Sequence, residues 1–234
     1  ALSVITNGAF DITVSPLIEL WGFGQHTRPD FSVIESKLPA LMSRIGQQLY
    51  SLPDEGVVAK HHAEVNLDVS AIAKGYAVDA LADLLRRHDI NDFLIEIGGE
   101  TRAGGKKGMH EPWTVGLEAP RAEKREIRWT LNVHNQALAS SGDYRNYFEH
   151  DGQRYSHLLD PRTGYPLRAR NIAINVLAAD CMEADAWATA LAILGREAGL
   201  ALAETRGVAV QFVEGNAYYR SEEFEKLVTK RIYP

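Results

Sequence analysis

One stretch near the C-terminal end, "MEADAWATALAIL" at residues 182–194, constrains the fold more than any other. From its third residue onward it is apolar except for Asp185 and Thr189. A helix that is hydrophobic all round belongs in a protein interior, so this stretch predicts a buried helix that other elements cover. Asp180, followed three residues later by Glu183, resembles an acidic capping box, and this leaves Asp185 without a capping role.

Asp185 and Thr189 are four residues apart, so in a helix their side chains lie one above the other on the same face. They would direct a carboxylate oxygen and a hydroxyl oxygen toward one point, and hard oxygen donors of this kind suit magnesium or calcium. Buried polar groups more commonly just find hydrogen bonds, and an acid in the first turn also complements the helix dipole. The pair alone is therefore compatible with a metal site or with two satisfied polar side chains.

The remaining patterns predict a fold of mixed secondary structure. Strands are expected at 64–70, 92–97, 113–118, 126–133, 136–141, 153–160, 172–178 and 208–213, and helices at 32–49 with an interruption at Pro39, 71–87, 182–194, 196–207 and 221–228. Turns are expected at 161–164 and at Gly215 and Asn216. Adjacent strands with tight turns, followed by helices, predict an α+β fold with packed helices on a largely antiparallel or mixed sheet. No linker divides the chain, so we expect a single domain over 1–234.

Composition excludes several classes of protein. The 234 residues carry a net charge of -6, and no run of Lys or Arg is longer than two, which argues against a nucleic-acid partner. The single cysteine, Cys181, excludes an internal disulfide and a multi-thiolate metal site. No apolar run approaches the roughly 20 residues of a membrane span. The chain begins at Ala1 and enters a motif directly, so we expect an upstream segment to be missing.

The segment "NLDVSAIAKG" places Asp68, Ser70 and Lys74 at the start of a predicted helix. Free backbone N–H groups and the helix dipole make such a start suitable for a phosphate, and Lys74 would add a positive charge. Taken singly, Asp68 is more simply an N-cap, and Lys74 a solvated lysine. In "EIGGET", the two glycines allow a ligand to approach the backbone or simply form a turn. The chain contains no GxGxxG or Walker A pattern.

The opening segment "GAFDITVSPLIELWGFG" combines aromatic and small residues with an acid, Asp11. It predicts either a hydrophobic wall with a helix-capping Asp or a pocket for a ring-shaped ligand. In "RYSHLLDP", strand alternation places Tyr155, His157 and Leu159 on one face. His157 lies near the end of that strand and is equally consistent with a structural and a catalytic imidazole. The other histidines considered lack ligand spacing and are expected to be structural or solvated: His61, His62, His110, His134 and His150.

Taken together, the chain resembles the ApbE-like flavin transferase family, the FAD:protein FMN transferases. The resemblance rests on six segments in order: "GAFDITVSPLIELWGFG", "LDVSAIAKGYAVD", "IEIGGE", "PWTVGLEAP", "ALASSGDYRNYFEHDGQRYSHLLDPRTGYP" and "EADAWATALAILG". It implies an enzyme that uses magnesium to move FMN from FAD to a Thr or Ser hydroxyl of a flavoprotein, with release of AMP. The family usually has Thr where Ser140 stands. Its members carry a further N-terminal region that helps close the flavin site, so we expect a flavin transferase domain lacking this segment.

The resemblance also implies roles for individual residues. It makes Asp185, Thr189 and the main-chain carbonyl of Ala71 the magnesium ligands, and His157 the catalytic base. It places the following residues around FAD: Ala9, Phe10, Asp11, Asp68, Lys74 and Leu159. The implied partner is an acceptor flavoprotein such as a subunit of a membrane redox complex, and the implied location is the periplasm or, as a lipoprotein, the inner membrane. A metal-dependent FAD pyrophosphatase and a non-catalytic FAD-binding protein are the alternatives.

Overall fold

The computed structural model describes residues 1–24, 29–120, 126–144 and 146–231. Its contacts divide the chain into two compact units. Unit 1 comprises residues 1–69 and 146–168, and unit 2 comprises residues 70–145 and 169–234. The expectation of a single domain stays a prediction, because this division describes contacts and not independent folding.

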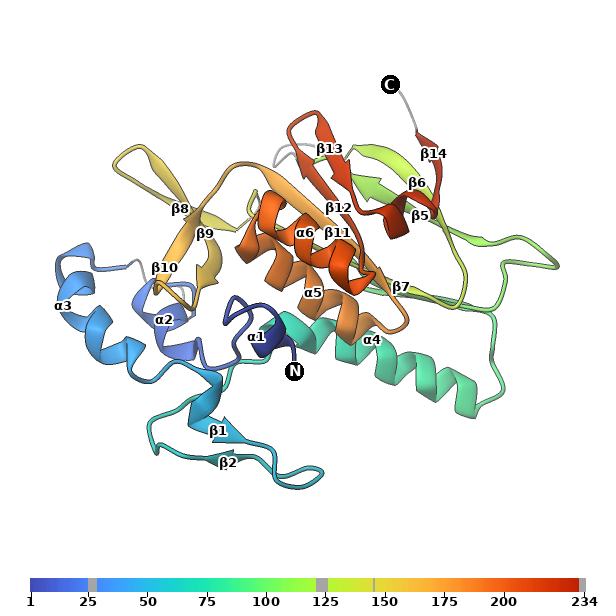
Figure 1. The fold of residues 1–234 in the computed structure, drawn as a ribbon. Coiled ribbons are helices and arrows are strands. Elements are labelled where there is room, and N and C mark those ends of the chain that lie inside the picture. Colours follow the sequence, from blue (N-terminus) through green and yellow to red (C-terminus); the bar gives the residue numbers. More distant parts are fainter. Residues whose placement is uncertain (25–28, 121–125, 145, 232–234) are drawn as a thin grey trace. The chain divides into compact units, whose positions relative to one another are not determined.

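Unit 1 combines short helices with two small antiparallel sheets (Figure 1). Its elements are α1 (Leu2–Ile5), α2 (Ser15–Leu20), α3 (Phe31–Met42), the 3-10 helix η1 (Gln47–Leu49), β1 (Tyr50–Ser51), β2 (Ala59–Lys60), β8 (Tyr147–His150), β9 (Gln153–Asp160) and β10 (Tyr165–Arg168). The predicted break at Pro39 is wrong, because α3 continues through it to Met42. Pro39 removes the usual donor to the Glu35 carbonyl, but Glu35 and Pro39 are both exposed, so water can hydrogen-bond there.

Aromatic rings form much of the core of unit 1. The Trp21 ring stacks at 6.3 Å from that of Tyr155 and at 6.5 Å from that of Phe148, and its Nε1 donates to the Gly164 carbonyl oxygen at 2.8 Å. These contacts join the opening segment to the β8–β9 hairpin and to the turn after β9. The predicted turn at 161–164 is confirmed, and it leads into β10, which the sequence analysis missed.

Unit 2 contains the longer helices and strands. Its elements are α4 (Ser70–Arg87), β3 (Phe93–Ile97), β4 (Glu100–Gly104), β5 (Trp113–Glu118), β6 (Ile127–Val133), β7 (Ala137–Gly142), β11 (Ile172–Ala178), α5 (Cys181–Leu194), α6 (Arg196–Arg206), β12 (Ala209–Glu214), β13 (Ala217–Arg220), α7 (Glu222–Glu225) and β14 (Val228–Arg231). A six-stranded sheet has the order β13-β12-β11-β7-β4-β3, and a three-stranded sheet the order β14-β6-β5. All the pairings between these strands are antiparallel, which confirms the predicted α+β fold.

The two sheets of unit 2 enclose a hydrophobic cluster. It includes Leu131 from β6, Leu138 from β7, Ala173 from β11 and Val213 from β12. Helix α5 packs along β7 and β11, and it also contacts α4 and α6 (Figure 1). Most of the α5 side chains are buried, so the prediction of a helix covered on all sides is confirmed. The predicted N-cap is confirmed too, because the Asp180 carboxylate accepts a hydrogen bond from the Glu183 N–H at 2.8 Å.

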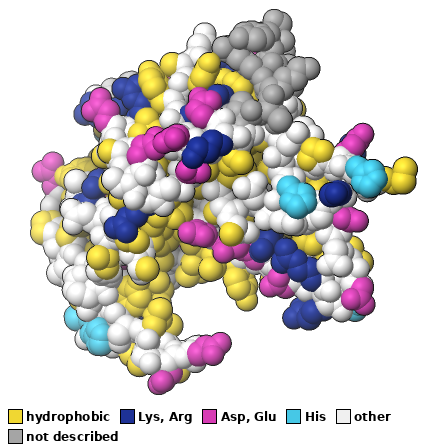
Figure 2. Space-filling model, turned by 45° about the vertical axis from the view of Figure 1, so that its right-hand side comes forward, with side chains coloured by type: hydrophobic (Ala, Val, Ile, Leu, Met, Phe, Trp, Pro, Cys, Tyr) yellow, Lys and Arg dark blue, Asp and Glu magenta, His cyan; other side chains and the backbone are white. Residues whose placement is uncertain are grey.

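The strand predicted at 64–70 is wrong, because residues 64–69 lie outside any strand and Ser70 begins α4, although Val65 is buried. Strand β3 forms within its expected range and is partly buried, with Leu94 40% exposed. None of the described helices combines the length and apolarity needed to cross a bilayer. On the face that Figure 2 shows, Lys and Arg side chains are interspersed with Asp and Glu side chains.

Candidate functional site

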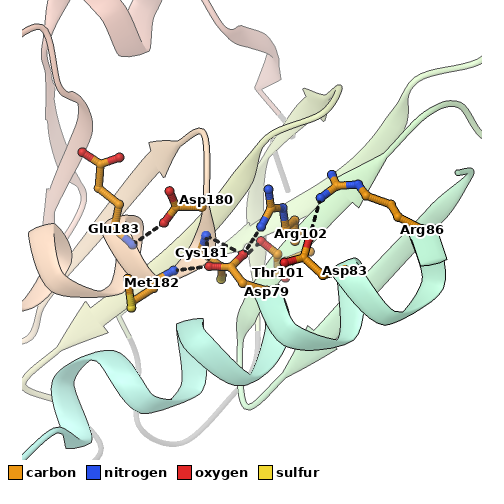
Figure 3. Close-up of polar contacts among 9 residues, drawn as sticks. All are labelled: Asp79, Asp83, Arg86, Thr101, Arg102, Asp180, Cys181, Met182 and Glu183. Carbon is orange, nitrogen blue, oxygen red and sulfur yellow. Dashed lines mark hydrogen bonds and ion pairs between the residues drawn. The ribbon is translucent and has the colours of Figure 1, made fainter. Parts of the chain in front are cut away.

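The start of α5 is fixed by Asp79, a residue of α4 (Figure 3). Its carboxylate accepts hydrogen bonds from the backbone N–H groups of Cys181 and Met182, each at 2.9 Å, and it also pairs with Arg102 from β4. The first N–H groups of a helix lack partners within the helix, so an acid supplied from elsewhere satisfies them and complements the dipole. Asp79 therefore holds α4, β4 and α5 in one arrangement.

Gly75 allows the two helices to approach closely. A Cβ atom added at Gly75 would lie 2.3 Å from the Cys181 carbonyl oxygen, a backbone atom. The Gly75 N–H donates to Asp185 Oδ2 at 3.1 Å. In an α-helix that N–H would normally be directed to the carbonyl of Ala71, four residues earlier. Asp185 therefore competes with the Ala71 carbonyl for one donor.

Two buried carboxylates share one lysine beside this contact. The Lys74 ammonium lies 2.6 Å from Glu100 Oε1 and 3.6 Å from Asp185 Oδ1. The side chains of Glu100 and Asp185 are 1% and 3% exposed, whereas that of Lys74 is 45% exposed. Lys74 is thus not a simple solvated lysine. The three side chains carry one more negative than positive charge when all are ionised.

Burial governs the electrostatics of this cluster. It raises the pKa of Asp185 and of Glu100 above the usual carboxyl range, and Lys74 opposes the rise in both cases. Glu100 Oε2 is buried and has no hydrogen-bond partner in the described part of the chain. Burial also raises the pKa of Cys181 to about 12, so this thiol stays protonated and unreactive at neutral pH.

The predicted magnesium ligands all belong to unit 2. The Thr189 hydroxyl lies 3.4 Å from Ser141 Oγ, and Asp185 accepts from the Gly75 N–H. Both side chains therefore have protein partners, as expected if they are simply satisfied buried polar groups. The donor set still fits a hard divalent cation, because carboxylate, hydroxyl and carbonyl oxygens stand in a region with excess negative charge. Among the described residues, no group of three or more His, Cys, Asp and Glu side chains is arranged for a metal. A cation here would depend on Asp185, Thr189 and the Ala71 carbonyl.

In unit 1, Asp11 stabilises a turn and does not cap a helix. Its carboxylate accepts hydrogen bonds from Thr13 N at 2.8 Å and Thr13 Oγ1 at 2.6 Å. Helix α2 instead begins after Val14 and has no side-chain cap, so the helix-capping interpretation of Asp11 is wrong. Ala9 is fully buried and Phe10 is half-buried. Asp68 lies beside this segment, because its N–H donates to the Ile12 carbonyl at 2.6 Å.

His157 is held by the backbone on β9. Its N–H donates to the Asn146 carbonyl oxygen at 3.0 Å, and its Nδ1 lies 3.1 Å from the same oxygen. A carbonyl can only accept, so Nδ1 carries the proton in the neutral ring and Nε2 carries the lone pair. That tautomer suits a base acting through Nε2. Leu159, two residues on, is 5% exposed and belongs to the hydrophobic core.

The other histidines follow the expectation that they are structural or solvated. His150 stacks on Phe31 with ring centroids 3.5 Å apart. The remaining four are exposed: His61, His62, His110 and His134.

The structure thus places the predicted residues in two groups. Ala71, Lys74, Asp185 and Thr189 lie in unit 2, and the other predicted FAD-binding residues lie in unit 1 with His157. The sequence analysis missed Glu100 and Asp79. The only sequence signal for Glu100 is an acid directly after Gly98 and Gly99, which form the turn between β3 and β4.

Comparison with known proteins decides the family. A family model described as the ApbE family matches residues 1–212.

The chain belongs to the ApbE family.

Two relatives in the ApbE family carry the name FAD:protein FMN transferase, which is the name of an enzyme. The one from Vibrio cholerae is 39% identical over 233 residues, which cover 98% of this chain and 70% of the relative. The one from Haemophilus influenzae is 36% identical, over 97% of this chain and 68% of the relative. Among solved structures, the flavin transferase ApbE from Vibrio cholerae superposes with a TM-score of 0.85 at 36% identity, covering 97% of this chain and 73% of that one. Identity and TM-score at this level support the likeness in fold.

Proposed function

We propose that this chain, an enzyme of the ApbE family, transfers FMN from FAD to a Thr or Ser hydroxyl of a flavoprotein in a magnesium-dependent reaction that releases AMP. The names of its relatives support the transfer of FMN to a protein. The observation that carries the proposal is the cluster of Lys74, Glu100 and Asp185 beside the start of α4. It combines a cation for phosphate oxygens, Lys74, with a buried acid for a metal, Asp185.

Unit 2 would handle the pyrophosphate. Asp185, Thr189 and the Ala71 carbonyl would hold Mg²⁺, and phosphate oxygens of FAD would complete its oxygen ligation. The bound ion would supply neutralisation of the negative charge that develops on the phosphoryl oxygens. Lys74 and the N–H groups at the start of α4 would attract the same oxygens.

Unit 1 would bind the flavin half and activate the acceptor. Half-buried Phe10 would offer apolar surface over the buried Ala9 and Leu159, and Asp11 and Asp68 would offer polar groups. His157 would take the proton of the acceptor hydroxyl at Nε2, and the hydroxyl oxygen would form a bond to the phosphorus of the FMN half. The bond from that phosphorus to the oxygen of AMP would break, so AMP leaves with the electron pair.

The acceptor and the location also belong to the proposal. The resemblance to the family supports an acceptor that is a flavoprotein, such as a subunit of a membrane redox complex. It equally supports a periplasmic or inner-membrane lipoprotein setting.

Intact mass spectrometry of a candidate acceptor tests the reaction. The acceptor is incubated with the protein, FAD and Mg²⁺, and a control lacks Mg²⁺ and contains a chelator. A mass increase of one phosphoester-linked FMN, lost when the target hydroxyl is removed, is the expected result. FMN and AMP formed without any change in acceptor mass would instead indicate a pyrophosphatase, and intact FAD would indicate a binding protein. Either outcome would overturn the transferase assignment.

A further inference from the structure

Glu100 is the least satisfied buried acid in the candidate site. Its side chain is 1% exposed, Oε1 lies 2.6 Å from the Lys74 ammonium, and Oε2 has no hydrogen-bond partner among the described residues. Leaving a buried polar atom without a partner normally costs about 1–3 kcal/mol. A charged oxygen without a partner is therefore an expensive feature, and it calls for an explanation beyond the packing of β4.

The aliphatic stem of Lys74 passes close to the β3–β4 turn. A Cβ added at Gly98 would lie 3.5 Å from Lys74 Cδ and 3.7 Å from Glu100 Oε2, so the aliphatic stem of Lys74 passes beside this turn. Glu100 directly follows the turn and contacts the ammonium. The ammonium of Lys74 is thus paired with the first residue of β4, and its stem lies beside the turn that precedes this residue.

The two acids do not share the lysine equally. A separation of 2.6 Å from Glu100 is a charge-assisted hydrogen bond, whereas 3.6 Å from Asp185 exceeds hydrogen-bonding distance. Asp185 Oδ2 accepts from the Gly75 N–H, so Oδ1 is the oxygen that faces Lys74. If Lys74 were released from Glu100, this oxygen would be its nearest acidic partner.

We propose that Glu100 is a positioning residue that holds the Lys74 ammonium away from Asp185 and so keeps Asp185 Oδ1 available to Mg²⁺. This inference rests on the proposed function, because it takes Asp185 as a metal ligand. It explains why Glu100, a buried acid that is not a predicted metal ligand, lies beside Asp185, which is a predicted ligand. It also leaves the ammonium fixed where it can meet a phosphate oxygen.

A double-mutant cycle on Mg²⁺ affinity tests the inference. Isothermal titration calorimetry with MgCl₂ alone is performed on the wild type, Glu100→Gln, Lys74→Gln and the double variant, after circular dichroism has established that each is folded. With Lys74 present, Glu100→Gln frees the ammonium to pair with Asp185, so we expect Mg²⁺ to bind about tenfold more weakly. In the Lys74→Gln background, Glu100→Gln should lower the Mg²⁺ affinity much less. The coupling between the two substitutions is then on the order of tenfold in affinity.

The direction in which Lys74→Gln changes the Mg²⁺ affinity is a second expectation. Lys74→Gln removes a competing cation, so Mg²⁺ alone should bind several-fold more tightly, while FAD, measured by flavin fluorescence without metal, should bind more weakly. Glu214→Gln is the matched control, because it also removes a carboxylate of unit 2 that is paired with a basic side chain, Arg196. Its Mg²⁺ affinity should equal that of the wild type.

The outcomes separate the inference from the proposed function. If Mg²⁺ binds the wild type and the Glu100→Gln effect is the same in both backgrounds, Glu100 acts as a direct ligand or through its charge alone, and the positioning role is wrong. If a Glu100 variant is destabilised but binds Mg²⁺ normally, its role is structural and the inference is also overturned. If the wild type binds no Mg²⁺, the proposed metal site fails and the inference fails with it.

Discussion

Gly75→Ala should destabilise the protein even though alanine is the better helix former. In a helix interior the change normally stabilises by about 1 kcal/mol. Here the new Cβ would lie 2.3 Å from the Cys181 carbonyl oxygen and 2.7 Å from Met182 Cα, whereas ordinary contact begins at 3.4 Å. Both atoms are backbone, so no side chain can turn away. Helices α4 and α5 would have to separate by about 1 Å.

That separation would also weaken the capping of α5. The N–H groups of Cys181 and Met182 donate to Asp79 at 2.9 Å, and an added 1 Å would place them beyond hydrogen-bonding distance. Overpacking costs about 1–3 kcal/mol, and hydrogen bonds to a charged group contribute about 1.5–3 kcal/mol. After the gain in helix propensity, we expect a net loss of roughly 2–4 kcal/mol in the free energy of unfolding.

Urea unfolding followed by circular dichroism measures this free energy. Ala80→Gly, at an exposed position of α4, is the control, because it should cost only the helix-propensity term of about 1 kcal/mol. A Gly75→Ala protein as stable as the wild type, or more stable, would show that the helices have room to separate and would refute the close-approach reasoning. Mg²⁺ titration of the same variant reports whether the Gly75 contact with Asp185 also supports the metal site.

Three further predictions concern the candidate site. Asp185→Ala should fold but lose both Mg²⁺ binding and FAD turnover, and calorimetry with a turnover assay checks this; retained activity with an unchanged metal requirement would contradict it. Because burial raises the pKa of Asp185 above its ordinary value of 3.8, the native state holds this proton to higher pH than the unfolded state, so its ionisation destabilises the fold as the pH rises. Urea unfolding without metal should therefore show the advantage of Asp185→Asn over the wild type growing as the pH rises above about 4, and a constant difference would refute it. His157→Ala should slow FMN transfer by roughly two to four orders of magnitude with an unchanged dissociation constant for FAD, measured by single-turnover kinetics and fluorescence; early melting with poor FAD binding would indicate a structural histidine.

Hydrophobic periodicity located the long elements because it reports burial. The helix over 182–194 begins one residue earlier, and β5, β9 and β11 have the expected bounds. The same signal failed at 64–70, where Val65 is buried but Val69 is 49% exposed, and residues 64–69 lie outside the strands of the described part of the chain. Alternation alone does not show that a segment is a paired strand, because a connecting segment can also bury single side chains such as that of Val65. Strands of two to four residues, such as β1 and β10, are too short to show a period.

A candidate site residue could be predicted from the sequence when it breaks the pattern of its own segment. Asp185 stands out because a buried helix rarely carries an acid, whereas Asp79 lies on a helix whose pattern tolerates charge. Its role depends on N–H groups at Cys181 and Met182, about 100 positions along the chain, so no local pattern reveals it. Glu100 is hidden for the same reason, because its significance comes from its contact with Lys74.

The energetics of this cluster favour binding over stability as its purpose. Burying ionised groups costs several kcal/mol each, and one shared ammonium offsets that cost only partly, so apolar replacements of buried ion pairs are often neutral or stabilising. Here Glu100 and Asp185 are nearly inaccessible, their pKa values are raised, and one carboxylate oxygen lacks a partner. The fold holds this unfavourable arrangement in place through contacts outside it, the Asp79 cap and the close approach at Gly75. A divalent cation supplies the positive charge that the cluster lacks, so metal binding should recover part of the free energy that folding the two acids costs.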